Sequence, residues 1–262
     1  MTTPAYFKRY DCCAMQRNEL GVLEIRLHTA GGPFKFSAAA RSELVETFFE
    51  VSRDRDNRAV ILTGTGDSWC AELLRDNAVQ QESSVDNVTR WDKLFWESKK
   101  VIQNLLDIEV PVIGAVNGPA LVHSEYLLTA NILIAANHAA FQDWPHLTFG
   151  VSPSDGVHVL WPYVLGPLRA HYFLLTQEKI TAQQALALGV VQEIMPAAAL
   201  LPRAHAIANQ LAKQSTLTLR YARVALTQRL KILVAQELPL GLAVEGLSAA
   251  ANAARANLER AR

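Results

Sequence analysis

The spacing of hydrophobic positions predicts strands that alternate with helices along most of the chain. Residues 22–27 alternate between the two faces of a strand, whereas residues 38–53 repeat large apolar side chains with the period of an amphipathic helix. Because these elements alternate and are bounded by Gly or Pro, they favour an α/β fold with crossover connections. Further strands are predicted at 59–62, 111–116, 132–136 and 190–194, and further helices through 91–105, from about Pro119, and after Thr181.

The later part of the chain changes from mixed to helical character. Thr181 and Gln184 have the spacing of a capping box, and Gly189 is a typical stop for the helix that they begin. From residue 200 onward the chain is rich in Ala and Leu with scattered Arg, which predicts two or three amphipathic helices. We therefore predict a core over residues 1–198 and a helical region over residues 199–262, with a mobile polar stretch at 76–87 inside the core.

Composition and charge exclude several classes of function. The 262 residues carry 25 basic and 25 acidic side chains, and a formal net charge of zero argues against nucleic-acid binding and polybasic membrane contact. Half of the residues are hydrophobic, yet we expect no apolar run to reach membrane-spanning length. Cys12, Cys13 and Cys70 lack a metal-binding spacing and the N-terminus starts no apolar leader, so we expect a reduced, cytoplasmic protein.

Four segments resemble, in the same order, the motifs of the crotonase (enoyl-CoA hydratase/isomerase) superfamily. Residues 59–71 (AVILTGTGDSWCA) are similar to the strand and loop that lead into the first oxyanion loop of that family, and residues 116–118 (VNG) are similar to the second. Residues 141–153 and 174–191 resemble the third and fourth motifs. The resemblance implies the crotonase fold, a repeated ββα spiral core, with a C-terminal helical region that assembles a homotrimer or a dimer of trimers.

The chain departs from that superfamily at the positions that carry its chemistry. The glycine triplet beside the second motif reads Val122-His123-Ser124, so His123 stands where a glycine would give its backbone N–H to an oxyanion hole. His146 and Tyr126 stand at the positions of two usual glutamates, and Glu72 replaces a glycine of the first loop. These departures resemble one branch of the superfamily, the carbon–carbon bond hydrolases similar to 6-oxocamphor hydrolase.

The two histidines are the main candidates for chemistry. His146 precedes Asp155 by one short loop, and an imidazole held by a carboxylate is a base suited to neutral pH. Alternatively, Asp155 caps the helix that follows it and His146 is an ordinary loop histidine. His123 is predicted to donate a hydrogen bond to a substrate oxyanion, with the backbone N–H of Leu73 as its companion. The alternative is a core histidine satisfied by a backbone carbonyl.

The remaining candidates each have a structural alternative. Glu245 lies among apolar residues of a predicted helix, so it faces either a pocket or solvent. An iron site from His123, His146 and Asp155 would have suitable ligand types, but the dyad accounts for the same residues and we expect no metal. Cys70 has no histidine nearby in sequence to activate it as a nucleophile. Apolar pocket walls are predicted from Trp144, Phe36, Trp69 and Phe34, and a solvated or subunit-facing stripe, rather than a CoA phosphate site, from Arg220, Arg223, Arg229 and Lys231.

The hydrolase resemblance and these residues together predict a cofactor-independent enzyme that cleaves a small β-diketone to a keto acid by a retro-Claisen reaction. Water activated by His146 and Asp155 would attack one carbonyl, and His123 with the Leu73 N–H would stabilise the oxyanion. The second carbonyl would accept the electrons of the broken bond. Two alternatives stay open, namely a CoA-dependent hydratase or isomerase and a non-catalytic binding protein with the same fold.

Overall fold

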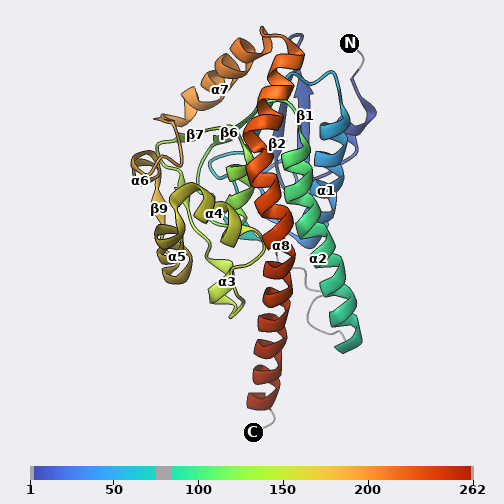
Figure 1. Cartoon of the computed structure of the whole chain (residues 1–262), viewed down its shortest axis with the longest axis vertical. Helices are drawn as coiled ribbons and strands as arrows, with labels where there is room; N and C mark the ends of the chain where they lie inside the picture. The colour runs from blue at the N-terminus through green and yellow to red at the C-terminus, as the bar shows by residue number, and fades with distance from the viewer. Residues whose placement is uncertain (1–2, 75–83, 261–262) are drawn as a thin grey trace.

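A mixed six-stranded sheet forms the centre of the computed structural model, which describes residues 3–74 and 84–260 (Figure 1). Its strands run in the order β1-β2-β4-β6-β7-β10, and only the β1–β2 pair among them is antiparallel. A parallel sheet needs a crossover after each strand, which the helices and loops supply. The strands are β1 (Cys13–Arg17), β2 (Val22–Leu27), β4 (Ala59–Gly64), β6 (Val112–Val116), β7 (Ile132–Ala136) and β10 (Glu193–Met195).

A second set of short pairings joins segments that follow the long strands in sequence. These segments pair in the same order as the long strands that precede them. Single bridges join Cys70 to Ala120 and Ala120 to Phe141, each in parallel orientation. Each turn of the chain therefore contributes a long strand, a short strand and a helix, which is the repeated ββα spiral expected from the resemblance. The short strands pair as β3 (Lys35–Phe36) with β5 (Glu72–Leu73), and β8 (Ala140–Phe141) with β9 (Ile180–Thr181).

Helices cover both faces of the sheet. On one face, small residues of α7 (Ala197–Ala212) pack against alternate residues of the strands, and on the other face α1 (Ala38–Arg53) and α2 (Ser84–Asp107) lie side by side (Figure 1). The two faces are separate because successive residues of a strand point in opposite directions. The other helices are η1 (Ala5–Lys8), η3 (Ser124–Thr129), α3 (Pro145–Thr148), α4 (Val157–Leu165), α5 (Pro167–Thr176), α6 (Ala182–Ala187) and α8 (Thr216–Arg260).

The strands predicted at 22–27, 59–62, 111–116 and 132–136 and the helix over residues 38–53 are confirmed, and so is the capping box of Thr181 and Gln184. The strand predicted at 190–194 lies instead at Glu193–Met195. The prediction of a helix from about Pro119 is wrong. Ala120 bridges two neighbouring segments there, and the chain becomes helical only at Ser124, because backbone pairing outweighs local helix propensity. Of the polar stretch at 76–87, residues 76–83 lie outside the described residues, and the rest begins α2.

Hydrogen bonds between the side chain of Asn117 and the backbone hold the first and second motif loops together. The side chain of Asn117 accepts a hydrogen bond from the N–H of Gly64 and donates to two carbonyls of the 64–68 segment. A Cβ atom on Gly118 would lie 1.8 Å from the carbonyl oxygen of Asp67, so only glycine fits at that position. The Asn-Gly pair therefore fixes where the loop that leads to His123 leaves the sheet.

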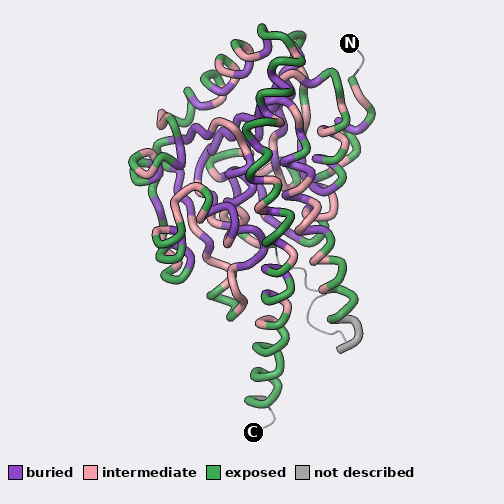
Figure 2. The backbone as a smooth tube through the Cα atoms, in the orientation of Figure 1, coloured by how far each residue is buried: buried purple, intermediate pink, exposed green. Residues whose placement is uncertain are grey.

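Helix α8 runs the length of the molecule and extends beyond it, where its residues are largely exposed (Figures 1 and 2). An 18-residue window of this helix has a mean hydropathy of 1.3, so the helix is long and apolar enough, by length and composition alone, to cross a membrane. The expectation that no segment reaches such a length is therefore wrong. The same helix packs against α2 and α4, and the division into a core and a helical region at residue 198 stays a prediction.

The prediction of a solvated or subunit-facing stripe is wrong for Arg223 on α8, because this residue is fully buried. Its guanidinium donates to the carbonyls of Leu105, Ile108 and Thr129, and burial lowers its pKa to about 10. Carbonyls at helix ends lack partners within the helix, and Arg223 supplies them where α2 and η3 end. Arg220 is also buried, whereas Arg229 is exposed.

Replacing Arg223 by Met should lower the free energy of unfolding by about 3 kcal/mol, because several buried carbonyls would lose their donor. Urea denaturation measures the change. Arg229→Met, on the exposed side of the same helix, is the matched control and should change stability by less than about 0.5 kcal/mol. Equal stabilities of the two variants would contradict the capping role.

Candidate active site

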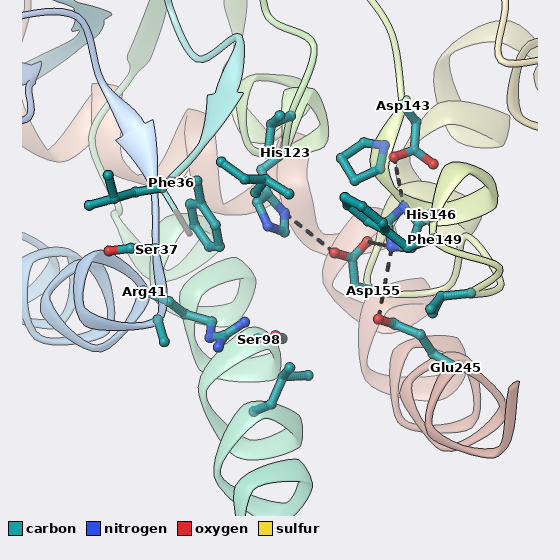
Figure 3. Close-up of a pocket in the computed structure, with 17 residues that line it drawn as sticks. Phe36, Ser37, Arg41, Ser98, His123, Asp143, His146, Phe149, Asp155 and Glu245 are labelled. Atoms are coloured by element: carbon teal, nitrogen blue, oxygen red, sulfur yellow. Dashed lines mark hydrogen bonds and ion pairs between the residues drawn. The ribbon is translucent and has the colours of Figure 1, made fainter. Parts of the chain in front are cut away.

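A cavity of about 580 Å³ opens beside the N-terminus of α1, and both candidate histidines line it (Figure 3). A cavity of this size suits a small organic molecule. Its lining combines apolar side chains with a cluster of histidines and carboxylates on one side. The lining residues include Phe36, Ser37, Arg41, Leu73, Leu74, Leu94, Ser98, Val122, His123, Asp143, His146, Phe149, Asp155 and Glu245.

His123 is held in an unusual backbone conformation at the start of η3. Its φ of 49° lies in the left-handed region, which costs a side-chain-bearing residue about 1–2 kcal/mol relative to glycine. The ring is stacked against Tyr126, with 4.9 Å between ring centroids, and contacts Phe36 at 3.9 Å. Its Nδ1 lies 2.8 Å from Glu125 Oε1 and 3.3 Å from Asp155 Oδ2. The strained position is therefore held by stacking and by carboxylates.

His146 contacts carboxylates through both ring nitrogens. Its Nδ1 lies 2.7 Å from Asp143 Oδ1, and its Nε2 lies 3.4 Å from Asp155 Oδ1 and 3.9 Å from Glu245 Oε1. Asp155 thus stands between the two histidines (Figure 3). The structure brings together all four side chains that the sequence nominated for catalysis. Helix α4 has Gly156 at its N-cap with no side-chain cap, so the alternative in which Asp155 caps that helix is wrong.

Three charged residues of the site were missed in the sequence. Asp143 lies three residues before His146, a spacing that places both side chains together across the start of α3. Glu125 is fully buried two residues after His123 and adjoins Tyr126, so a carboxylate is present beside the position where the resemblance indicated that one was lost. Arg41 could have been noticed in the sequence only as the one charged side chain, a cation, in the first turn of a predicted helix.

Burial and mutual charge shift the pKa values of this cluster strongly. Burial raises the pKa of Glu125 to about 7 and that of Glu245 to about 8. Burial acts in the same direction on Asp155, but the charge of His146 outweighs it and holds the pKa of Asp155 below its usual range. Burial opposes the charged form of His146, yet Asp155 and then Asp143 raise its pKa well above 6.5. At neutral pH the site therefore holds an imidazolium beside an ionised Asp155, with Glu245 largely protonated.

The predicted pocket walls are only partly where the sequence placed them. Phe36 and Leu73 line the cavity. Trp144, Trp69 and Phe34 do not, which corrects the prediction. Trp69 is buried in the core, Phe34 packs edge-on against Phe36, and Trp144 packs behind Phe149 while its indole N–H donates to a backbone carbonyl. Phe34 and Trp144 therefore support the wall from behind, whereas Trp69 belongs to the core.

The donor set could also hold a cation. His123, Glu125 and Asp155 place one ligand atom each within 4.8 Å of one another, and so do His146, Asp155 and Glu245. Nitrogen and oxygen donors of this kind suit a divalent metal, so the expected absence of a metal stays a prediction. Cys70 does not fit the alternative of a nucleophile, because burial raises the pKa of its thiol to about 12.

The chain matches known proteins over most of its length. A family model described as enoyl-CoA hydratase/isomerase matches residues 17–243. A crotonyl-CoA hydratase of Syntrophomonas wolfei is 31% identical over 198 residues, which cover 74% of this chain and 74% of that protein. A 1,2-epoxyphenylacetyl-CoA isomerase of Escherichia coli is 29% identical over 210 residues, which cover 79% of each chain.

Solved structures show the same fold. A β-diketone hydrolase from the cyanobacterium Anabaena sp. PCC 7120, bound to (S)-3-oxocyclohexyl acetic acid, is 54% identical with a TM-score of 0.91, covering 95% of this chain and 98% of that chain. An enoyl-CoA hydratase/isomerase from Pseudoalteromonas atlantica shares the fold at 20% identity, with a TM-score of 0.78 and coverage of 95% and 97%. The predicted crotonase fold is confirmed.

Asp155→Asn should lower the pKa of His146 toward its ordinary value, because the largest stabilising charge on the imidazolium is removed. NMR titration of the histidine ring signals measures this pKa. Asp143→Asn is the matched control and should lower it less. A larger effect of the Asp143 variant would contradict the order in which Asp155 and Asp143 raise the pKa of His146.

The pKa of His146 is higher in the folded protein than in the unfolded chain. Protonation of His146 therefore contributes its full stabilisation of the fold below about pH 6.5, and this stabilisation is lost as the pH rises through the pKa of the folded protein.

Proposed function

This chain belongs to the enoyl-CoA hydratase/isomerase family, and we propose that it hydrolyses a carbon–carbon bond of a β-diketone to give a keto acid. The observation that carries the proposal is the buried Asp155 carboxylate between two histidines at the cavity wall. The Anabaena β-diketone hydrolase supports it, because that protein is 54% identical and binds a keto acid.

His146 is the proposed base that activates water. Asp143 lies at its Nδ1, so Nε2 is the nitrogen left to take a proton, beside Asp155 and Glu245. Among the described residues, Asp155 Oδ1 and Glu245 Oε2 are buried without a hydrogen-bond partner, and these acceptors could hold a water molecule next to Nε2. The raised pKa of His146 stabilises the imidazolium that forms when it takes the proton, so turnover should increase as the pH rises through that pKa.

His123 is the proposed donor to the oxyanion, together with the backbone N–H of Leu73. Both residues line the cavity. A histidine donates from Nε2 only when that nitrogen carries the proton. Glu125 has a pKa of about 7, and its protonated form can donate to Nδ1 over 2.8 Å, which would fix the tautomer that has its proton on Nε2. Glu125 would thus act as a positioning residue.

The rest of the reaction needs no external cofactor. Attack of water on one carbonyl gives a tetrahedral oxyanion, and cleavage of the adjacent carbon–carbon bond leaves an enolate on the second carbonyl. The imidazolium of His146 then returns its proton to the carbon of the enolate. A cyclic diketone gives a single keto acid, an open-chain diketone gives a carboxylic acid and a ketone, and one water molecule is consumed in either case.

A panel of cyclic, bicyclic and open-chain β-diketones, run in parallel with crotonyl-CoA, tests the proposal. We expect hydrolysis of at least one diketone, and replacement of His146 by Ala should lower its kcat about 10²–10⁴-fold. Turnover of crotonyl-CoA alone would instead support the CoA-dependent alternative. Turnover of neither compound class would favour the non-catalytic alternative.

His123→Ala should lower kcat on the diketone about 10²–10³-fold, as expected for a lost oxyanion-hole donor. Glu125→Gln, whose amide N–H can still donate to Nδ1, should retain more activity than Glu125→Met, which cannot. Steady-state kinetics and thermal unfolding are measured on the same samples. If His123 were a core histidine, its replacement would instead reduce stability by roughly 1–3 kcal/mol while activity per folded molecule held.

We also propose that the protein assembles as a homotrimer or a dimer of trimers in the cytoplasm. Several large apolar side chains of α8 are exposed in the single chain, among them Leu226, Leu240 and Leu247, and such surface is usually covered by a partner. Light scattering should give the mass of three or six chains of 28.9 kDa. A monomer at micromolar concentration would contradict this assembly.

A further inference from the structure

Arg41 places a positive charge at the same cavity, on the wall formed by the start of α1 (Figure 3). Its side chain is 12% exposed, and its Nε lies 3.3 Å from Glu97 Oε2. The guanidinium also lies over the ring of Phe36, 5.8 Å from the centroid. The same ring contacts His123, so Phe36 lies against both the cation and the histidine.

The position of Arg41 in its helix is unfavourable for helix stability. A helix dipole favours acidic residues at the N-terminus and disfavours cations there, yet the first turn of α1 contains no acidic residue. Ser37, which caps this helix, and Ala38 also line the cavity. The positive end of a 16-residue helix and a guanidinium therefore face the same space. Such an arrangement makes this wall a site for a negative charge.

The neighbours of Arg41 leave this wall positively charged. Glu97 is buried and also pairs with Lys93 at 3.6 Å, so the cluster of Arg41, Lys93 and Glu97 keeps a formal charge of +1. In the part of the chain that the structure describes, Arg41 hydrogen-bonds to the protein through Nε. A guanidinium has four further N–H groups on its two terminal nitrogens, and these can bind an oxygen of a ligand.

The two sides of the cavity have opposite polarity. Asp143, Asp155 and Glu245 lie with His146 on one side, and Arg41 lies on the other beside Ser98 (Figure 3). Burial is the main cause of the raised pKa of Glu245, and the charge of Arg41 is among the groups that oppose this rise, so the cation acts across the cavity. A reaction that moves negative charge away from the carboxylates would be favoured by this field.

We propose that Arg41 binds the oxygen of the second carbonyl and stabilises it as the enolate forms, an inference that rests on the proposed diketone hydrolysis. In that step the bond between the hydrated carbonyl carbon and the central carbon breaks. Its electron pair forms the carbon–carbon double bond of the enolate, and the carbonyl π pair moves to the oxygen beside Arg41. The proton that His146 took from water is then delivered to the central carbon. Arg41 is thus a catalytic residue that acts on the leaving group.

Two β-diketones that differ in the basicity of the released enolate test this role. One carries hydrogen on the central carbon, and the other carries chlorine there, which lowers the basicity of the enolate without directing attack to one carbonyl. Arg41→Gln should lower kcat about 10²–10³-fold on the unsubstituted substrate and clearly less on the chlorinated one, because a weakly basic enolate needs less stabilisation. Arg41→Lys, which keeps the charge, should recover at least about tenfold over Arg41→Gln. Arg53→Gln, at the exposed C-terminal end of the same helix, is the matched control and should leave both rates within about twofold.

A binding measurement gives a second readout. A cyclic 1,3-dione that is ionised at the assay pH mimics the enolate, and calorimetric titration should show at least about tenfold weaker binding to Arg41→Gln than to the unmodified protein. Equal losses of kcat on both substrates, or unchanged binding of the ionised dione, would overturn the inference while diketone hydrolysis stood. A protein that cleaved neither diketone would overturn the proposed function and the inference together. Circular dichroism checks that each variant is folded.

Discussion

The candidate site depends on the interaction of the Asp155 carboxylate with two histidines. The carboxylate is buried between His123 and His146, and each imidazole lies within 3.4 Å of one of its oxygens. A buried carboxylate is costly unless positive charge compensates it, and the imidazolium of His146 supplies that charge. The same contact raises the pKa of His146 and lowers that of Asp155. One ion pair therefore fixes the geometry and the protonation state of the site together.

The fold holds His123 in the strained backbone conformation that this arrangement requires. His123 occupies a left-handed backbone position that favours glycine, and the locked Asn117-Gly118 turn fixes the loop that leads to it. Stacking on Tyr126 and contact with Phe36 hold the ring once the backbone has placed it. The backbone of this loop thus presents the His123 side chain to the cavity.

Local patterns in the sequence predicted most of the sheet and the order of its elements, and the strand over residues 132–136 agrees to the residue. They failed where tertiary contacts decide the outcome, as at Pro119, where strand bridging replaces a helix, and at Arg223, which is buried against helix ends. The two histidines and Asp155 could be nominated from their positions in motifs. Glu125 and Arg41 could not, because their importance depends on burial and on which wall of a cavity they reach.

Isotope labelling of a single turnover product tests the central claim most directly. In H₂¹⁸O, hydrolysis of a β-diketone by attack of water should place one ¹⁸O in the carboxylate of the keto acid. In D₂O, a diketone whose central carbon carries two alkyl groups should gain one deuteron at that carbon, which is released as an enolate. Mass spectrometry and NMR of the product measure both labels. A carboxylate product without ¹⁸O, or no cleavage of any diketone, would contradict the account.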